Sequence, residues 1–267
     1  MGKRQRLWPI LTLISVVITV IIFSGFIYAT NEIISPSHKS PKNIQISPST
    51  TPSVSTKTIR IVGLGDSLTK GYGDSSGLGY AGNVKNIIQS NHKKKKVVLV
   101  NFAVNGAKTV DLINQLQTKS GVASTLKTSQ YVLVTIGGND LYKQGQPITA
   151  TELNQIEQRR QTTLANLKLI FKEITAINPE LKIIYVGLYN PFQVVDASGT
   201  MASLIQSWNQ DVSNLSLQFS QVTVVPMFDL FLNRTTTYLW NDVYHPNMFG
   251  YKQMAIRVAQ VLEADFK

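Results

Sequence analysis

A serine, a histidine and an aspartate stand in an order that could support nucleophilic catalysis. Ser67 lies in Gly65-Asp66-Ser67-Leu68, directly after an apolar run, while Asp242 and His245 stand three residues apart near the C-terminus. A serine hydroxyl is a weak nucleophile that needs a base, and the base needs an acid to orient it. We therefore predict that Ser67 is a nucleophile, that His245 is its base and that Asp242 fixes the imidazole tautomer.

Each of these residues also has an ordinary structural interpretation. Ser67 could cap the N-terminus of a helix, and Asp242 could cap the helix that follows it. Asp229, at the end of the last apolar run, is the alternative acid if geometry excludes Asp242. The other two histidines lie in polar segments rich in proline or lysine, which leaves His245 as the candidate base.

The apolar runs before these residues have the composition of strands that are covered on both faces. The expected strands are 59–64, 97–103, 131–136, 182–188 and 222–226, and the expected helices are 79–91, 108–118, 151–177, 201–219 and 247–265. This alternation predicts one α/β domain over residues 58–267, with five parallel strands and helices on both faces. Ligands bind such sheets at the carboxyl ends of the strands, where Ser67 is expected.

The order of four short blocks resembles the SGNH, or GDSL-type, serine hydrolase family, in its secreted or membrane-anchored bacterial branch. The blocks are Gly65-Asp66-Ser67-Leu68, Asn105-Gly106, Gly137-Gly138-Asn139-Asp140 and Asp242-x-x-His245. The resemblance covers residues 58–267 and implies a three-layer α/β/α, flavodoxin-like fold that hydrolyses esters without a cofactor. It also implies that Gly106 and the Asn139 side chain complete an oxyanion hole with the backbone N–H of Ser67. Asp66 and Asp140 are expected to support these loops by hydrogen bonding.

Three functions remain open at this stage. The first is a lipase-like or lysophospholipase-like serine esterase, the second is an O-acetyl esterase acting on cell-wall or other polysaccharide, and the third is a non-catalytic surface-binding module. A long apolar acyl channel would favour a lipid substrate, and an open polar groove would favour a glycan. The residues Tyr189, Asn190, Pro191 and Phe192, after the fourth expected strand, could line the pocket or pack within a loop.

The first 57 residues are expected to lie outside this domain. Residues 1–6 form a basic tail, residues 7–29 carry no charge, and residues 30–57 are rich in Ser, Thr and Pro. A helix over 7–29 would extend about 34 Å, enough to cross a hydrocarbon core of roughly 30 Å. The basic tail predicts a cytoplasmic N-terminus, a signal anchor, an extended linker and an extracytoplasmic domain on the cell membrane. Secretion after signal cleavage near Ala29 is the alternative.

Composition limits the partners of the chain. The formal net charge is +11 and there is no cysteine, which excludes disulfides and thiolate metal sites. The three histidines show no ligand-pair spacing, so neither a metal nor a cofactor is expected. The run Lys93–Lys96 is interpreted as a solvated loop, with weak attraction to an anionic surface as the alternative. We expect a monomer whose partners are an ester substrate and the membrane, and not nucleic acid.

Overall fold

Five short apolar strands form one parallel sheet, as the strand and helix patterns predict. In chain order they are β1 (Thr58–Gly65), β2 (Lys96–Asn101), β3 (Tyr131–Thr135), β4 (Lys182–Val186) and β5 (Val222–Val225). Their spatial order is β2-β1-β3-β4-β5, and every neighbouring pair is parallel. The direction of progression reverses between β1 and β3, which is the switch point where open α/β sheets bind ligands.

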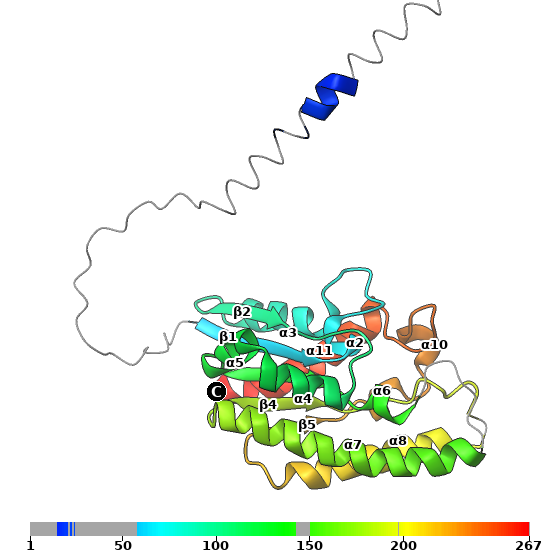
Figure 1. The fold of residues 1–267 in the computed structure, drawn as a ribbon. Coiled ribbons are helices and arrows are strands. Elements are labelled where there is room, and N and C mark those ends of the chain that lie inside the picture. The colour runs from blue at the N-terminus through cyan, green and yellow to red at the C-terminus, as the bar shows by residue number, and fades with distance from the viewer. Residues whose placement is uncertain are drawn as a thin grey trace, which may run out of the picture. The chain divides into compact units, whose positions relative to one another are not determined.

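Helices cover both faces of this sheet and make the three layers visible in Figure 1. One face carries α4 (Thr109–Thr118), α5 (Ser120–Lys127), α7 (Ala150–Ile177) and α8 (Thr200–Ser216), and the other carries α3 (Gly79–Asn91) and α11 (Met248–Glu263). The alternation of side chains along β1 explains the two layers. Val62 and Leu64 belong to the first core, whereas Ile59 and Ile61 belong to the second.

Short helices occupy the loops around the sheet. They are α2 (Ser67–Lys70), α6 (Gly138–Leu141), α9 (Phe228–Phe231), α10 (Thr235–Tyr238) and the 3-10 helix η2 (Ala264–Phe266). The sequence patterns predicted none of the four short α-helices and missed α5 as well, while the expected helix 247–265 runs into η2. In α5 only Val122 and Leu126 are buried, so its apolar stripe is too short to stand out from the polar residues around it.

The two strands at the switch point approach closely because of one glycine. Gly65 ends β1 with a φ of +107°, and a Cβ there would lie 1.8 Å from the backbone oxygen of Thr135 on β3. The next residue, Asp66, donates its backbone N–H to this same oxygen at 2.9 Å. The chain therefore leaves β1 against the end of β3 and delivers Ser67 to the carboxyl edge of the sheet.

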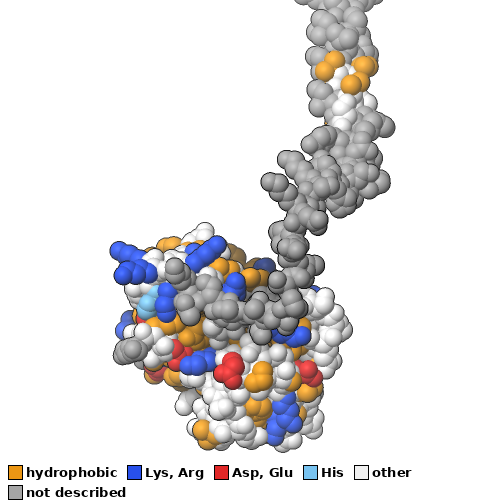
Figure 2. Space-filling view, turned by 90° about the vertical axis from the view of Figure 1, so that its left-hand side faces the viewer, with side chains coloured by type: hydrophobic (Ala, Val, Ile, Leu, Met, Phe, Trp, Pro, Cys, Tyr) orange, Lys and Arg blue, Asp and Glu red, His pale blue; other side chains and the backbone are white. Residues whose placement is uncertain are grey.

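The amino ends of the strands lie at the opposite edge of the sheet, which faces the viewer in Figure 2. Thr58 of β1 pairs there with Lys96 of β2, and basic side chains gather near one corner of this side of the molecule. Lys93, Lys94 and Lys96 are exposed, and the Nζ of Lys95 lies 4.9 Å from the ring centre of Phe266. The lysine run is thus mainly a solvated loop, as predicted.

This computed structural model describes residues 15–20, 22, 24, 58–142, 150–196 and 198–266. The chain divides into two units, Met1–Ser53 and Val54–Lys267, and the second unit contains the fold above. Within the described ranges no helix has both the length and the apolar character needed to span a bilayer. Most of the predicted membrane segment 7–29 and the whole predicted linker 30–57 lie outside the described residues.

Candidate active site

Ser67, His245 and Asp242 form one continuous chain of hydrogen bonds. The Oγ of Ser67 is 2.8 Å from Nε2 of His245, and Nδ1 of His245 is 2.6 Å from Oδ2 of Asp242. Ser67 is the first residue of α2, while the other two residues lie in the turn between α10 and α11. The fold therefore brings together the three residues that the sequence singled out, although they come from opposite ends of the domain.

The charge of Asp242 determines how the protons are arranged in this chain. Burial, the largest single influence, raises the pKa of Asp242, but hydrogen bonds from the His245 ring and from the backbone N–H groups of His245 and Tyr244 together outweigh it, so the net pKa is lowered. An anionic carboxylate can only accept hydrogen bonds, so Nδ1 of His245 carries the hydrogen. Nε2 then presents its lone pair to the Ser67 hydroxyl, which is the arrangement a general base requires.

Other residues perform the helix capping that was the alternative interpretation of Ser67 and Asp242. The side chain of Asp66 caps α2 and accepts the backbone N–H of Leu68 at 3.0 Å. The side chain of Asn247 caps α11 through two backbone N–H groups of its first turn. Ser67 and Asp242 consequently direct their side chains to His245.

Asp229, the alternative acid, is engaged elsewhere. Two guanidinium nitrogens of Arg257 donate to its carboxylate oxygens at 2.6 and 2.8 Å, and these hydrogen bonds lower the pKa of Asp229. It is Asp242 that is hydrogen-bonded to the imidazole. Across the described ranges, no group of three or more acidic or histidine side chains is arranged to hold a metal ion.

The third sequence block contacts the residue that follows the second block. Asn139 lies on α6 in the wall of the cavity that Ser67 also lines, and its Nδ2 donates to the backbone oxygen of Ala107 at 3.0 Å. Gly106 precedes that alanine with a φ of +76°, and a Cβ there would meet no atom within 4 Å. The positive φ is a backbone conformation that glycine adopts without strain.

A buried network of hydroxyl groups supports the loop that carries Ser67. The Thr135 hydroxyl donates to Asp66 at 2.6 Å and contacts the Thr69 hydroxyl at 2.7 Å, which in turn contacts the Tyr80 hydroxyl at 2.8 Å. These bonds join β1, α2, α3 and β3 beneath the candidate nucleophile. Burial, only partly offset by the bonds from Thr135 and Leu68, raises the pKa of Asp66 to about 7. Asp66 is therefore a supporting residue, as predicted.

Asp140 supports the neighbouring loop in the same way. Its carboxylate accepts the backbone N–H of Thr109 at 3.0 Å and the Thr109 hydroxyl at 2.6 Å. These bonds fasten α6 to the first residue of α4. Since Asn139 precedes Asp140, they also hold the candidate oxyanion donor in place.

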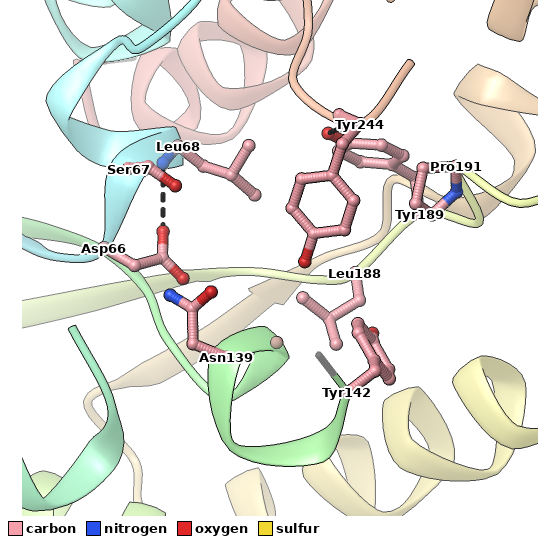
Figure 3. A pocket seen from close by; sticks show the side chains of 10 residues that line it. Asp66, Ser67, Leu68, Asn139, Tyr142, Leu188, Tyr189, Pro191 and Tyr244 are labelled. Atoms are coloured by element: carbon pink, nitrogen blue, oxygen red, sulfur yellow. Dashed lines mark hydrogen bonds between the residues drawn. The ribbon is translucent and has the colours of Figure 1, made fainter. Parts of the chain in front are cut away.

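One wall of the cavity is mainly polar and the other is mainly apolar, as Figure 3 shows. Asp66, Ser67, Leu68 and Asn139 lie on one side, and the other side is formed by Tyr142, Leu188, Tyr189, Pro191 and Tyr244. The cavity volume is about 20 Å³. A site of that size has room for about one water molecule.

The predicted aromatic segment lines this cavity only in part. Tyr189 and Pro191 belong to its wall, while Phe192 packs behind it with its ring centre 5.7 Å from that of Tyr142 and 6.1 Å from that of Tyr244. Sequence reasoning missed Tyr142 and Tyr244 as cavity residues. The position of Tyr244 between Asp242 and His245 was the available signal, since a residue in that short turn must lie near the imidazole.

Comparisons with known proteins agree with this geometry. The model of the GDSL-like lipase/acylhydrolase family matches residues 64–253. The Bacillus subtilis protein YpmR is 32% identical over 211 residues, which cover 78% of this chain and 82% of YpmR. The spore germination lipase LipC of Bacillus licheniformis is 26% identical over 211 residues, covering 74% of this chain and 93% of LipC.

Solved structures share the fold at low sequence identity. The lipase Lip_vut3 from a goat rumen metagenome superposes with a TM-score of 0.64 at 22% identity, covering 76% of this chain and 96% of the lipase. A variant of Axe2, an acetyl-xylooligosaccharide esterase from Geobacillus, superposes with a TM-score of 0.58 at 20% identity, covering 78% of this chain and 95% of the esterase. The family match contains all four sequence blocks and the hydrogen-bonded residues Ser67, Asp242 and His245. The chain therefore belongs to the GDSL-like lipase/acylhydrolase family and is a serine hydrolase that acts on ester bonds.

Proposed function

We propose that this chain is an extracytoplasmic serine esterase that works through an acyl-enzyme on Ser67. The observation that carries the proposal is the unbroken chain from Ser67 through His245 to Asp242 beside a small cavity. The Oγ of Ser67 bonds to the ester carbonyl carbon while Nε2 of His245 takes its proton. The carbon–oxygen bond to the alcohol then breaks, and His245 returns the proton to the departing oxygen. Water activated by His245 releases the acid from Ser67.

The oxyanion is held, in this proposal, by the backbone N–H groups of Ser67 and Gly106 and by the Asn139 side chain. An amide nitrogen carries two hydrogens. One hydrogen of Asn139 is used on the oxygen of Ala107, which fixes the amide plane and leaves the other for the substrate. Such a preset donor costs no reorganisation when charge develops on the oxygen.

The cavity favours a short acyl group. Its volume of about 20 Å³ accommodates little more than a methyl group, and Tyr142, Leu188 and Tyr244 are among the residues of its wall. An acetyl ester fits this space directly, whereas a long acyl chain requires these side chains to move. LipC is named as a lipase and Axe2 as an acetyl-xylooligosaccharide esterase, so both substrate types are represented among the similar proteins. The small cavity favours an acetyl group over a long acyl chain.

The proposed location rests on the N-terminal sequence. Residues 7–29 carry no charge, and the basic residues of positions 1–6 precede them. We propose that this segment is an uncleaved signal anchor and that residues 30–57 tether the esterase outside the cytoplasm. The alternative is release after cleavage near Ala29.

A serine-reactive phosphonate and a panel of ethyl esters test the assignment. The full-length chain should gain one phosphonyl group on Ser67 and should hydrolyse ethyl acetate faster than ethyl octanoate. Ser67→Ala should lose both properties, while Ser90→Ala, at an exposed helix position, should keep both. In Asn139→Ala the turnover number should fall by roughly 10²–10³ with little change in KM, because its contact forms mainly in the transition state. Wild-type turnover in both Ser67→Ala and Asn139→Ala would refute the proposal.

A further inference from the structure

The imidazole of His245 contacts two aromatic rings, one in the wall of the cavity and one exposed to solvent. The ring centre of Tyr244 is 5.0 Å from that of His245, and Tyr244 lines the cavity. The ring centre of Tyr72 is 4.8 Å from His245, and Tyr72 is 43% exposed. The candidate base thus contacts one ring of the cavity wall and one ring that is exposed to solvent.

The position of Tyr72 is held by the elements around it. Its backbone N–H donates to the oxygen of Ser67 at 3.0 Å, and its own oxygen accepts the hydroxyl of Tyr251 at 2.7 Å. Gly73 has a φ of +87°, and a Cβ there would lie 2.9 Å from the oxygen of Pro246. The turn that carries Tyr72 is therefore pressed against the turn that carries His245, so its ring stays over the imidazole.

An exposed tryptophan ring adjoins Tyr72, and an exposed valine lies in the same turn as His245. Trp240 is 39% exposed, and its ring stands edge-on to Tyr72 at 5.7 Å and 88°. Val243 is 72% exposed. The backbone N–H of Trp240 donates to the backbone oxygen of His245 at 2.7 Å. The backbone N–H of Val243 donates to the backbone oxygen of Trp240 at 2.9 Å. The hydrogen bonds of this turn thus hold both side chains on the segment that presents the imidazole.

Val243 has an unexpected backbone conformation. Its φ is +50°, a left-handed value that a β-branched residue adopts at a cost and that glycine or asparagine adopts readily. The same residue exposes a branched apolar side chain to water. Strained residues cluster at sites where ligands are bound. A side chain that is both strained and exposed, two residues from His245, points to a contact outside the folded chain.

Resting on the acyl-enzyme route proposed above, we propose that Tyr72, Trp240 and Val243 form a subsite for an apolar alcohol portion of the ester. During acylation the bond from Ser67 Oγ to the carbonyl carbon forms and the bond from that carbon to the alcohol oxygen breaks. The proton that His245 took from Ser67 moves to this oxygen. The alcohol must therefore lie within reach of His245, on the side away from the acyl cavity. The substrate class is a short-chain acyl ester of a larger apolar alcohol.

Acetate esters of linear primary alcohols, from ethanol to hexanol, test this subsite. These alcohols have nearly equal basicity, so differences among the esters report binding and not intrinsic reactivity. For the purified full-length chain, kcat/KM should rise by about twofold for each added methylene, as expected for partial burial. Because every ester gives the same acetyl-enzyme, kcat should stay level wherever deacylation is slowest. A flat kcat/KM series with active enzyme would overturn the subsite alone, and no hydrolysis of any ester would overturn the proposed function with it.

Matched variants separate the subsite from the stability of the turn. Val243→Asn removes the apolar side chain and relieves the backbone, so the melting temperature should hold or rise while the dependence of kcat/KM on alcohol length weakens. Trp240→Ala should weaken this dependence on alcohol length further. Neither variant should change the ratio of kcat/KM for ethyl acetate to kcat/KM for ethyl butyrate. Leu217→Ala, which alters an 85% exposed residue after α8, should change neither the dependence on alcohol length nor the ratio of ethyl acetate to ethyl butyrate hydrolysis. Variants at Val243 and Trp240 that lower kcat/KM equally for every alcohol would overturn the subsite.

Discussion

At the scale of single residues, the site depends on which acid holds His245. Asp242 accepts the Nδ1 hydrogen at 2.6 Å and is itself kept anionic by two backbone N–H groups. Asp229 lies nearer than Asp242 to the last strand in the sequence, but it pairs with Arg257. A carboxylate in the role of Asp242 fixes the tautomer that leaves Nε2 free to accept a proton.

Asp242→Asn and Asp229→Asn form a matched pair. In the proposed mechanism Asp242→Asn permits the wrong tautomer, so kcat should fall by about 10⁴. Asp229→Asn breaks only a surface ion pair and should leave kcat near the wild-type value. Steady-state hydrolysis of ethyl acetate by both variants measures this difference. Equal losses in the two variants would contradict the assignment of Asp242.

Asp66 should make the stability of the domain depend on pH. Its pKa is about 7 in the folded chain, against an ordinary value of 3.8 for an aspartate in water, so between these values the folded state binds more protons than the unfolded state. Stability must then fall as the pH rises through this window, by up to about 4 kcal/mol, and level off above it. Asp66→Asn cannot ionise and keeps one oxygen to accept from Leu68 and Thr135.

Urea unfolding of the wild type and of Asp66→Asn at several values between pH 4 and pH 8 measures this contribution. The stability of the wild type relative to the variant should decline steadily toward pH 7 and then stay constant. A difference that is the same at every pH would show that Asp66 ionises in the folded chain as readily as in the unfolded one.

The sequence predicted the residues of the hydrogen-bonded chain better than those of the cavity wall. Ser67, Asp242 and His245 were recognisable because few residue types can do this chemistry and their spacing is short. Tyr72 and Tyr142 were not singled out, because a tyrosine is common in cores and loops alike. Their part in the site appears only once the turns and α6 are placed around His245.

At the scale of elements, the long periodic segments were predicted closely and the short ones were missed. The expected helix 79–91 coincides with α3, and each expected strand overlaps an observed one. The run 97–103 was expected to continue as a strand, but β2 ends at Asn101, whose side chain accepts the backbone N–H of Ala103 and donates to Thr69. Side-chain bonds of this kind depend on a distant partner, so local composition cannot predict them.

The pair Gly137 and Gly138 provides a test at this scale. Gly137 has a φ of +109°, and a Cβ there would lie 2.8 Å from the ring of Trp208, whereas a Cβ on Gly138 would have ordinary contacts starting at 3.7 Å. Gly137→Ala should push α6 away from α8, lower the free energy of unfolding by about 2 kcal/mol or more and displace Asn139. Gly138→Ala should keep a melting temperature near that of the wild type.

Thermal unfolding and ester hydrolysis of both glycine variants give the comparison. Gly137→Ala is expected to lose turnover together with stability, since Asn139 follows two residues later on α6. A wild-type melting temperature for Gly137→Ala would show that the Trp208 ring moves aside at little cost. The position of α6 would then not depend on its packing against Trp208.

At the scale of the whole molecule, the domain class and its sheet followed from the alternation of strand and helix patterns. Nearly continuous Val, Ile and Leu runs require cover on both faces, which leaves few arrangements besides a parallel sheet between two helix layers. The size of the cavity could not be predicted in this way. It depends on residues such as Tyr142, Leu188 and Tyr244, which are far apart in the sequence and meet only in the wall of the cavity.

The proposed anchor gives a prediction for the full-length chain. If residues 7–29 span the membrane, the chain should sediment with membranes, and protease added to intact cells should release the esterase. A chain beginning at residue 58 should remain in solution and hydrolyse ethyl acetate at the wild-type rate. Detergent-dependent aggregation of the shortened chain, or a mature form beginning near Thr30 found only in the medium, would contradict this arrangement.

The placement of the two ends of β1 has a practical consequence. The strand begins at Thr58 and ends at Gly65, two residues before Ser67, so the entry of the chain and the nucleophile lie at opposite edges of the sheet, about 25 Å apart. A support, a fluorophore or a fused protein attached just before Thr58 would leave the mouth of the site open to bulk solution. The domain is therefore suited to oriented immobilisation on a bead or an electrode through its N-terminal side, with every copy presenting its catalytic edge outward.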